Sequence, residues 1–154
     1  MAVKIRKTTL KDVYILVERI REIDKTEIAL ATGHKPVEAL KHGYERSYYI
    51  RTILNQGKVI GIFGATKHCV LTDSACVWLI GAKDFYKVKR DLLIYSKRYI
   101  KRMLKPVAKL ENDVWVENKA SIRWLKWCGF KFEKPRPYGL SKALFSHFYM
   151  RKEK

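Results

Sequence analysis

Apolar residues in the first third of the chain follow first a strand-like and then a helix-like period. Alternation over residues 3–9 predicts a strand, after which Thr9 can cap a helix that ends near Asp24. Residues 26–32, which stop before a glycine, and residues 36–47, which open on a proline, predict two more helices. We therefore expect a strand followed by three short helices.

The middle of the chain combines β-rich runs with one long helix pattern. Residues 49–54 and 59–66 flank a Gly-containing connection of hairpin length, which predicts two antiparallel strands. Residues 75–82 form a continuous apolar run, typical of a strand buried on both faces. The pattern over residues 84–104 predicts the longest helix, with Asp84 as its N-cap.

The C-terminal part adds a strand, a helix closed by a glycine, and two more strands, at residues 108–118, 119–128, 130–134 and 143–150. Helices that cross between neighbouring strands, with hairpins at the ends, imply an α/β (α+β) fold in which helices cover both faces of a mixed sheet. At 154 residues, we expect one domain over residues 1–154.

Composition limits the protein classes further. The chain has no run of 18 apolar residues, and its basic N-terminus lacks the apolar segment of a secretory signal, so we expect neither a membrane span nor export by a signal peptide. Cys69, Cys76 and Cys128 form no Cys-x-x-Cys pair and are expected to be reduced, buried thiols. The four histidines show no metal-ligand spacing, so no metal site is expected.

Positive charge is the strongest compositional signal. Lys and Arg outnumber Asp and Glu by 33 to 15, a formal net charge of +18 that attracts nucleic acid, acidic protein surfaces or polyanionic ligands. The long helix carries a basic stripe largely opposite its apolar face, formed by Lys87, Arg90, Lys97, Lys101 and Lys105. This stripe fits either a solvated helix face or a surface for an anionic partner.

Residues 115–130, WVENKASIRWLKWCGF, join a strand ending in Asn118 to a helix that closes on Gly129 and Phe130. This spacing resembles the GNAT (Gcn5-related N-acetyltransferase) family. Together with VWLIG at residues 77–81, it also resembles small GNAT-like bacteriophage proteins related to an internal virion protein of T7-like phages. The resemblance implies a GNAT-like sheet with splayed central strands, acetyl-CoA as acyl donor, and a location in the bacterial host cytoplasm or the phage virion.

The resemblance also implies cofactor contacts at the end of the apolar strand, at the start of the long helix and at the motif asparagine: Leu79, Ile80, Gly81, Lys87, Lys89, Arg90 and Asn118. In the family, glycines before the long helix let backbone N–H groups hold the CoA pyrophosphate. Here Asp84, Lys87 and Lys89 occupy the matching positions. We expect Lys87 and Lys89 to supply side-chain charge in place of the glycine N–H groups.

The catalytic positions depart from the family as well. A tyrosine often stands seven residues after the motif asparagine as general acid, but Leu125 occupies that position and cannot donate a proton. Glu111, Asp113 and Glu117 are the candidate bases, unless they only solvate a strand edge.

Two functions therefore stay open. One is an acyl-CoA-dependent N-acetyltransferase with a degenerate pyrophosphate loop. The other is a non-catalytic basic protein of the same fold that binds nucleic acid or an acidic host or virion protein. For Trp124 and Trp127, which share one side of their helix, core packing is favoured over stacking on a base or adenine.

Overall fold

The computed structural model describes residues 3–69 and 71–153. The side chains of His68 and Cys69 lie outside the described residues, and so the expectation that the Cys69 thiol is buried concerns a side chain that is not described. The elements are, in chain order, β1 (Val3–Lys7), α1 (Leu10–Val17), α2 (Glu22–Thr32), α3 (Pro36–Arg46), β2 (Ser47–Asn55), β3 (Lys58–Cys69), β4 (Ser74–Gly81), the 3₁₀ turn η1 (Phe85–Val88), α4 (Lys89–Leu104), β5 (Lys109–Trp115), α5 (Lys119–Cys128), β6 (Lys131–Phe132), β7 (Arg136–Tyr138) and β8 (Ala143–Arg151).

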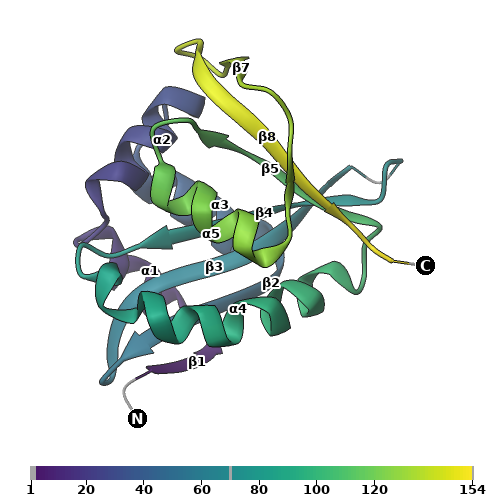
Figure 1. The fold of residues 1–154 in the computed structure, drawn as a ribbon. Helices are drawn as coiled ribbons and strands as arrows, with labels where there is room; N and C mark the ends of the chain where they lie inside the picture. The colour runs from purple at the N-terminus through teal and green to yellow at the C-terminus, as the bar shows by residue number, and fades with distance from the viewer. Residues whose placement is uncertain (1–2, 70, 154) are drawn as a thin grey trace.

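The strands form one mixed sheet in the order β1-β2-β3-β4-β5-β8-β6, with β7 also paired to β8. The pair β4–β5 is parallel and is joined by the crossover helix α4, as a parallel pair requires. Figure 1 shows α4 and α5 in front of the sheet and α1 and α3 behind it. The expected α/β fold, a mixed sheet with helices on both faces, is confirmed. Within the described residues, no helix is long and apolar enough to cross a membrane.

Strand β3 separates two apolar layers. The Phe63 ring packs edge-on against Tyr99 of α4, with 5.4 Å between ring centroids. Because side chains alternate across a strand, Ile62 points to the opposite face, where α1 and α3 cover β3. Both residues are buried, so the centre of the sheet is packed from both sides.

The first helix is shorter than predicted. Helix α1 ends at Val17, and Ile20 forms an isolated bridge with Ala82 before α2 begins. Backbone bonds from Arg21 N–H to the Gly81 carbonyl and from Lys83 N–H to the Arg19 carbonyl tie this connection to the end of β4. The expected continuation of the helix to Asp24 is wrong, because these bonds to β4 replace helical ones.

Helix α2 is held at its C-terminal end by the β7–β8 connection. Leu140 N–H donates to the Ala31 carbonyl, and the Ser141 backbone N–H and side-chain hydroxyl both donate to the Leu30 carbonyl. The last carbonyls of a helix lack intrahelical partners, so these bonds satisfy them. Gly139, at φ +71°, lies so close to Ala31 that a Cβ would be 2.4 Å from the Ala31 carbonyl oxygen.

Candidate active site

The central strands β4 and β5 separate partway along their length. Their parallel pairing covers three residues of each strand and ends at Cys76 and Glu111, although both strands continue beyond these positions. Just past the last pair, Asn112 Nδ2 donates a hydrogen bond of 2.7 Å to the Val77 carbonyl oxygen. A side chain thus takes the place of the next backbone bond, and the expected splay of the central strands is present.

Past this point, β4 presents an open edge to the gap. Ala82 N–H donates to the Ile60 carbonyl on β3, and backbone groups alternate in direction along a strand. The N–H and C=O groups of Leu79 and Gly81 therefore point away from β3. Gly81 N–H donates to Asp24 Oδ2 at 2.8 Å, whereas the backbone groups of Leu79 face the gap.

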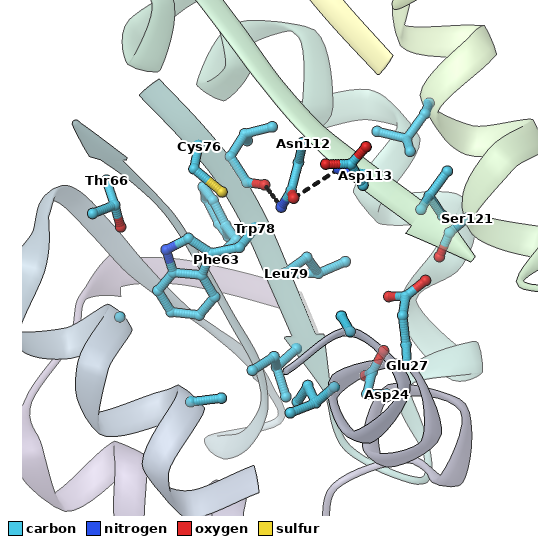
Figure 2. Close-up of a pocket in the computed structure, with 18 of the residues that line it drawn as sticks. Asp24, Glu27, Phe63, Thr66, Cys76, Trp78, Leu79, Asn112, Asp113 and Ser121 are labelled. Atoms are coloured by element: carbon cyan, nitrogen blue, oxygen red, sulfur yellow. Dashed lines mark hydrogen bonds between the residues drawn. The ribbon is translucent and has the colours of Figure 1, made fainter. Parts of the chain in front are cut away.

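A cleft of about 840 Å³ occupies this gap. It lies between helices on opposite faces of the sheet, and its lining includes Ile28 of α2, Gly43 of α3, Leu92 and Tyr95 of α4, and Ser121 and Trp124 of α5. Figure 2 shows Trp78 and Leu79 of β4 on one side of the gap and Asn112 and Asp113 of β5 on the other. Since helices from both faces line it, the cleft passes through the sheet.

Two carboxylates of α2 connect the separated strand ends. Asp24 accepts from Gly81 N–H at the end of β4, and Glu27 Oε2 accepts from Trp115 N–H at the end of β5, at 2.9 Å. Residues three apart share a helix face, which lets one helix reach both strands. Figure 2 shows both carboxylates directed from α2 toward the space between the strands.

Glu27 is held in a half-buried position. Burial raises the pKa of its carboxyl group, and the hydrogen bonds from Trp115 N–H and Asn118 Nδ2 offset this only in part. Both bonds reach Oε2, and within the described residues none reaches Oε1. A carboxylate with a raised pKa and one unused oxygen, directed into a cleft, has the properties of a general base.

The motif asparagine connects this carboxylate to α5. Asn118 Oδ1 caps the helix by accepting from Ser121 N–H at 3.4 Å, and its Nδ2 donates to Glu27 at 3.3 Å. Asn118 is buried and lines the cleft, as do two other predicted cofactor contacts, Leu79 and Ile80. Gly81 lies at the edge of this group, with its N–H bonded to Asp24.

The three predicted bases occupy different surroundings. Asp113 lines the cleft, and its Oδ1 lies 3.2 Å from Nδ1 of His147. Glu111 bonds to Nε2 of the same imidazole at 2.9 Å; burial alone would raise its pKa, but bonds from Lys109, Ser74 and His147 hold that pKa below its usual value. Glu117 is exposed. Of the three, only Asp113 belongs to the cleft lining that the structure describes.

Lys87, Lys89 and Arg90 are exposed around the start of α4, apart from the described cleft lining. The preceding segment is the 3₁₀ turn η1, in which the N–H groups of Phe85, Lys87 and Lys89 already donate to backbone carbonyls. These three N–H groups therefore do not form an open phosphate-binding loop.

Asp84 does not cap the long helix, so that prediction is wrong. Its Oδ1 accepts instead from Arg19 Nη2 at 2.6 Å, and Arg19 Nη1 also donates to the Val59 carbonyl. Burial would raise the pKa of Asp84, but its backbone bond and Arg19 lower it. The acidic residue of this loop is thus neutralised by a cation from the α1–α2 connection.

The residues of α5 differ in environment. Trp124 Nε1 donates to Ser96 Oγ on α4 at 2.9 Å, and its ring packs against the core, as expected. Trp127, by contrast, is 47% exposed, and Lys97 Nζ lies 4.5 Å from its ring centroid. Leu125 is buried and lines the cleft, so the position of the absent tyrosine does belong to the site.

No protein-family model and no curated protein sequence matches the chain. Solved structures do. Spermidine N-acetyltransferase from Vibrio cholerae, in complex with CoA and spermine, superposes with a TM-score of 0.72 at 15% identity, over 97% of this chain and 95% of that one. YncA from Salmonella typhimurium, with its cofactor acetyl-CoA, gives 0.71 at 16% identity, over 100% and 96%. An acetyltransferase of the GNAT family from Streptococcus pneumoniae gives 0.65 at 15% identity, over 97% and 99%. The chain therefore has the GNAT fold.

Proposed function

We propose that this protein is an acyl-CoA-dependent N-acetyltransferase. The observation that carries the proposal is the through-sheet cleft at the splayed pair β4–β5, in a fold whose solved neighbours hold CoA or acetyl-CoA. A cleft of about 840 Å³ is within the range of small-molecule sites.

The open edge of β4 fits an acyl-CoA, whereas the turn before α4 differs from the glycine-rich pyrophosphate loop expected from the resemblance. The Leu79 backbone groups at the open edge of β4 can pair with an extended amide-containing arm, as strands pair with added chains. The turn before α4 has no glycine, and three of its N–H groups are already bonded, so the phosphates require the side chains of Lys87, Lys89 and Arg90. When bound, acetyl-CoA supplies an acyl thioester.

The chain itself contributes positioning and charge stabilisation. Leu79 N–H, which points into the gap, can stabilise negative charge on an acyl oxygen. Apolar and aromatic residues of α4 and α5 exclude water from that side of the cleft. Leu125 has no proton to give, so the leaving sulfur must take its proton from another source.

Thermal unfolding with acetyl-CoA tests the proposal. A ligand present at 100 times its dissociation constant stabilises the native state by about 2.7 kcal/mol, which is readily measured. Thiol release from acetyl-CoA in the presence of an amine mixture then reports transfer. No stabilisation at millimolar acetyl-CoA contradicts the proposal.

A second function is favoured by the outer surface of α4 and α5. Lys97, Arg98, Lys101, Lys126 and Trp127 are all exposed there. An exposed indole with Lys97 over its ring, on helices that expose further cations, suits binding of single-stranded nucleic acid, the alternative that the net charge of +18 also supports. Retention on single-stranded DNA that falls steeply with salt and is weakened by Trp127→Ala would support this function; retention that ignores salt would exclude it.

A further inference from the structure

The described cleft lining is acidic in a strongly basic chain. Five residues with carboxylate side chains line the cleft: Asp24, Glu27, Glu38, Glu45 and Asp113. Among the described lining residues, Lys41 is the one Lys or Arg, although these residues outnumber Asp and Glu by 33 to 15 in the whole sequence. A concave site lined by one sign of charge concentrates ligands of the opposite sign.

The lining carboxylates come from α2, α3 and β5 and not from α4 or α5. Four of the five carboxylates lie on α2 and α3, and Asp113 belongs to the cluster around His147. The described lining residues of α4 and α5 are uncharged and include Leu92, Tyr95, Tyr99 and Trp124. The two sides of the cleft therefore suit different ligands.

Of the carboxylates, Glu27 is the one best able to take up a proton. Asp24 is already paired, because both of its oxygens accept from Arg21, at 2.8 and 3.0 Å, and Oδ2 also accepts from Gly81 N–H. Asp113 accepts from the His147 imidazole, Glu38 Oε1 accepts from Lys35 N–H at the start of α3, and Glu45 is exposed near the end of that helix. Glu27 Oε1, between the ends of the two strands, accepts no hydrogen bond from the described part of the chain.

We infer that the α2–α3 side of the cleft is an acceptor site for a cationic amine and that Glu27 is the group that deprotonates it. This inference rests on the proposed acyl transfer. The ammonium nitrogen gives one proton to Glu27 and forms a bond to the acyl carbon while the carbon–sulfur bond breaks. The sulfur leaves with the electron pair of that bond and receives the surplus proton of the nitrogen, so the products are an amide and a thiol.

Three acceptors of equal chain length test the charge preference. Cadaverine has a second ammonium group, n-pentylamine has an apolar end, and aminovalerate has a carboxylate. We expect kcat/KM to decrease in that order, with cadaverine at least about tenfold above aminovalerate and the difference shrinking at high salt. Aminovalerate equal to or better than cadaverine overturns the inference, as does acetyl-CoA binding without transfer to any of the three. Absence of acetyl-CoA binding instead overturns the proposed function.

Glu27→Gln tests the proton acceptor, since glutamine keeps an oxygen that can accept from Trp115 N–H. We expect kcat to fall about 10²-fold or more and the acidic limb of the pH–rate profile to disappear, with acetyl-CoA stabilisation unchanged. The charged groups that act on Glu27 are Asp24 and Arg21, while β5 and α5 face it with the Trp115 N–H and the Asn118 amide, so this limb should lie above the pKa of an ordinary glutamate.

Glu22→Gln, on the same helix but exposed, is the matched control and should leave the profile intact. If Glu27→Gln melts early, Glu27→Asp provides the second variant, with partial activity and a retained limb expected. A wild-type profile in a folded Glu27→Gln variant overturns the role of Glu27.

Discussion

Asn112 on β5 donates a hydrogen bond of 2.7 Å to the carbonyl of Val77 on β4, each residue lying one position beyond the last pair of the parallel ladder. The strands separate immediately after this contact, so the amide marks the inner end of the cleft. Without this amide, the half-buried Val77 would have a carbonyl with no ladder bond.

Replacing this amide should therefore loosen the junction. In Asn112→Ala, the Val77 carbonyl loses its donor, and we expect the free energy of unfolding to fall by about 1–3 kcal/mol in urea titrations. Asn112→Asp should cost more, because a carboxylate has no proton to donate and would face the carbonyl oxygen. Unchanged stability of both variants would show that the contact does not hold the strands.

The contact between the β7–β8 connection and the C-terminal end of α2 can be tested at Gly139. Gly139→Ala forces an L-residue to φ +71° and places its Cβ 2.4 Å from the Ala31 carbonyl oxygen, so we expect a loss of about 2 kcal/mol or more and reduced acyl transfer, because α2 carries Glu27. Gly57→Ala is the matched control: its φ is +78°, but among the described residues no atom beyond its chain neighbours lies within 4 Å of the added Cβ. Equal losses in the two variants would mean that the contact with α2 contributes nothing.

The start of α1 predicts a pH dependence of stability. Burial would raise the pKa of Asp12, but hydrogen bonds from Arg6, Thr9 and Thr52 lower it below its usual value of 3.8. A carboxylate with a lowered folded-state pKa stabilises the protein above its unfolded-state pKa, and this stabilisation is lost as pH falls through the folded-state value.

Asp12→Asn should therefore unfold about 1–3 kcal/mol more easily at neutral pH, and its stability should fall less between pH 5 and pH 2 than that of the wild type. Chemical denaturation across this pH range measures both effects. Parallel pH curves for variant and wild type would assign the acid sensitivity to other carboxylates.

Phosphate recognition by side chains can be separated from the rest of the cofactor. Replacing Lys87, Lys89 and Arg90 together by alanine should weaken acetyl-CoA about tenfold or more and flatten the salt dependence of its binding. Acetyl-pantetheine, which lacks the nucleotide phosphates, should bind variant and wild type equally. Equal losses with both donors would contradict a role in phosphate binding.

Local chemistry allowed much of the fold to be predicted. The β2–β3 hairpin, the crossover α4 and the helix α5, with Asn118 before it and Gly129 after it, follow from signals within a few residues of each element. The predictions failed where distant residues decide. Asp84 caps no helix because its partner is Arg19, 65 positions away, and α1 ends early because its connection bonds to the end of β4.

Glu27 was missed for the same reason. Along the sequence, it is one of several charges on a short, weakly amphipathic helix, and nothing local separates it from Glu22. Its importance comes from Trp115 and Asn118, which lie 88 and 91 positions away. The spacing of Asp24 and Glu27, three residues apart on one helix face, was the available signal, but this spacing does not indicate which strands the helix reaches.

The passage through the sheet also has a kinetic consequence. Helices α4 and α5 line one side of the cleft and α2 and α3 the other, so the proposed acyl donor and amine can occupy the cleft together. Neither ligand has to depart before the other arrives, and no covalent acyl–enzyme is needed to store the group in between. Initial-rate plots at several fixed amine concentrations should therefore intersect, whereas parallel lines would indicate that the two ligands visit the cleft in turn.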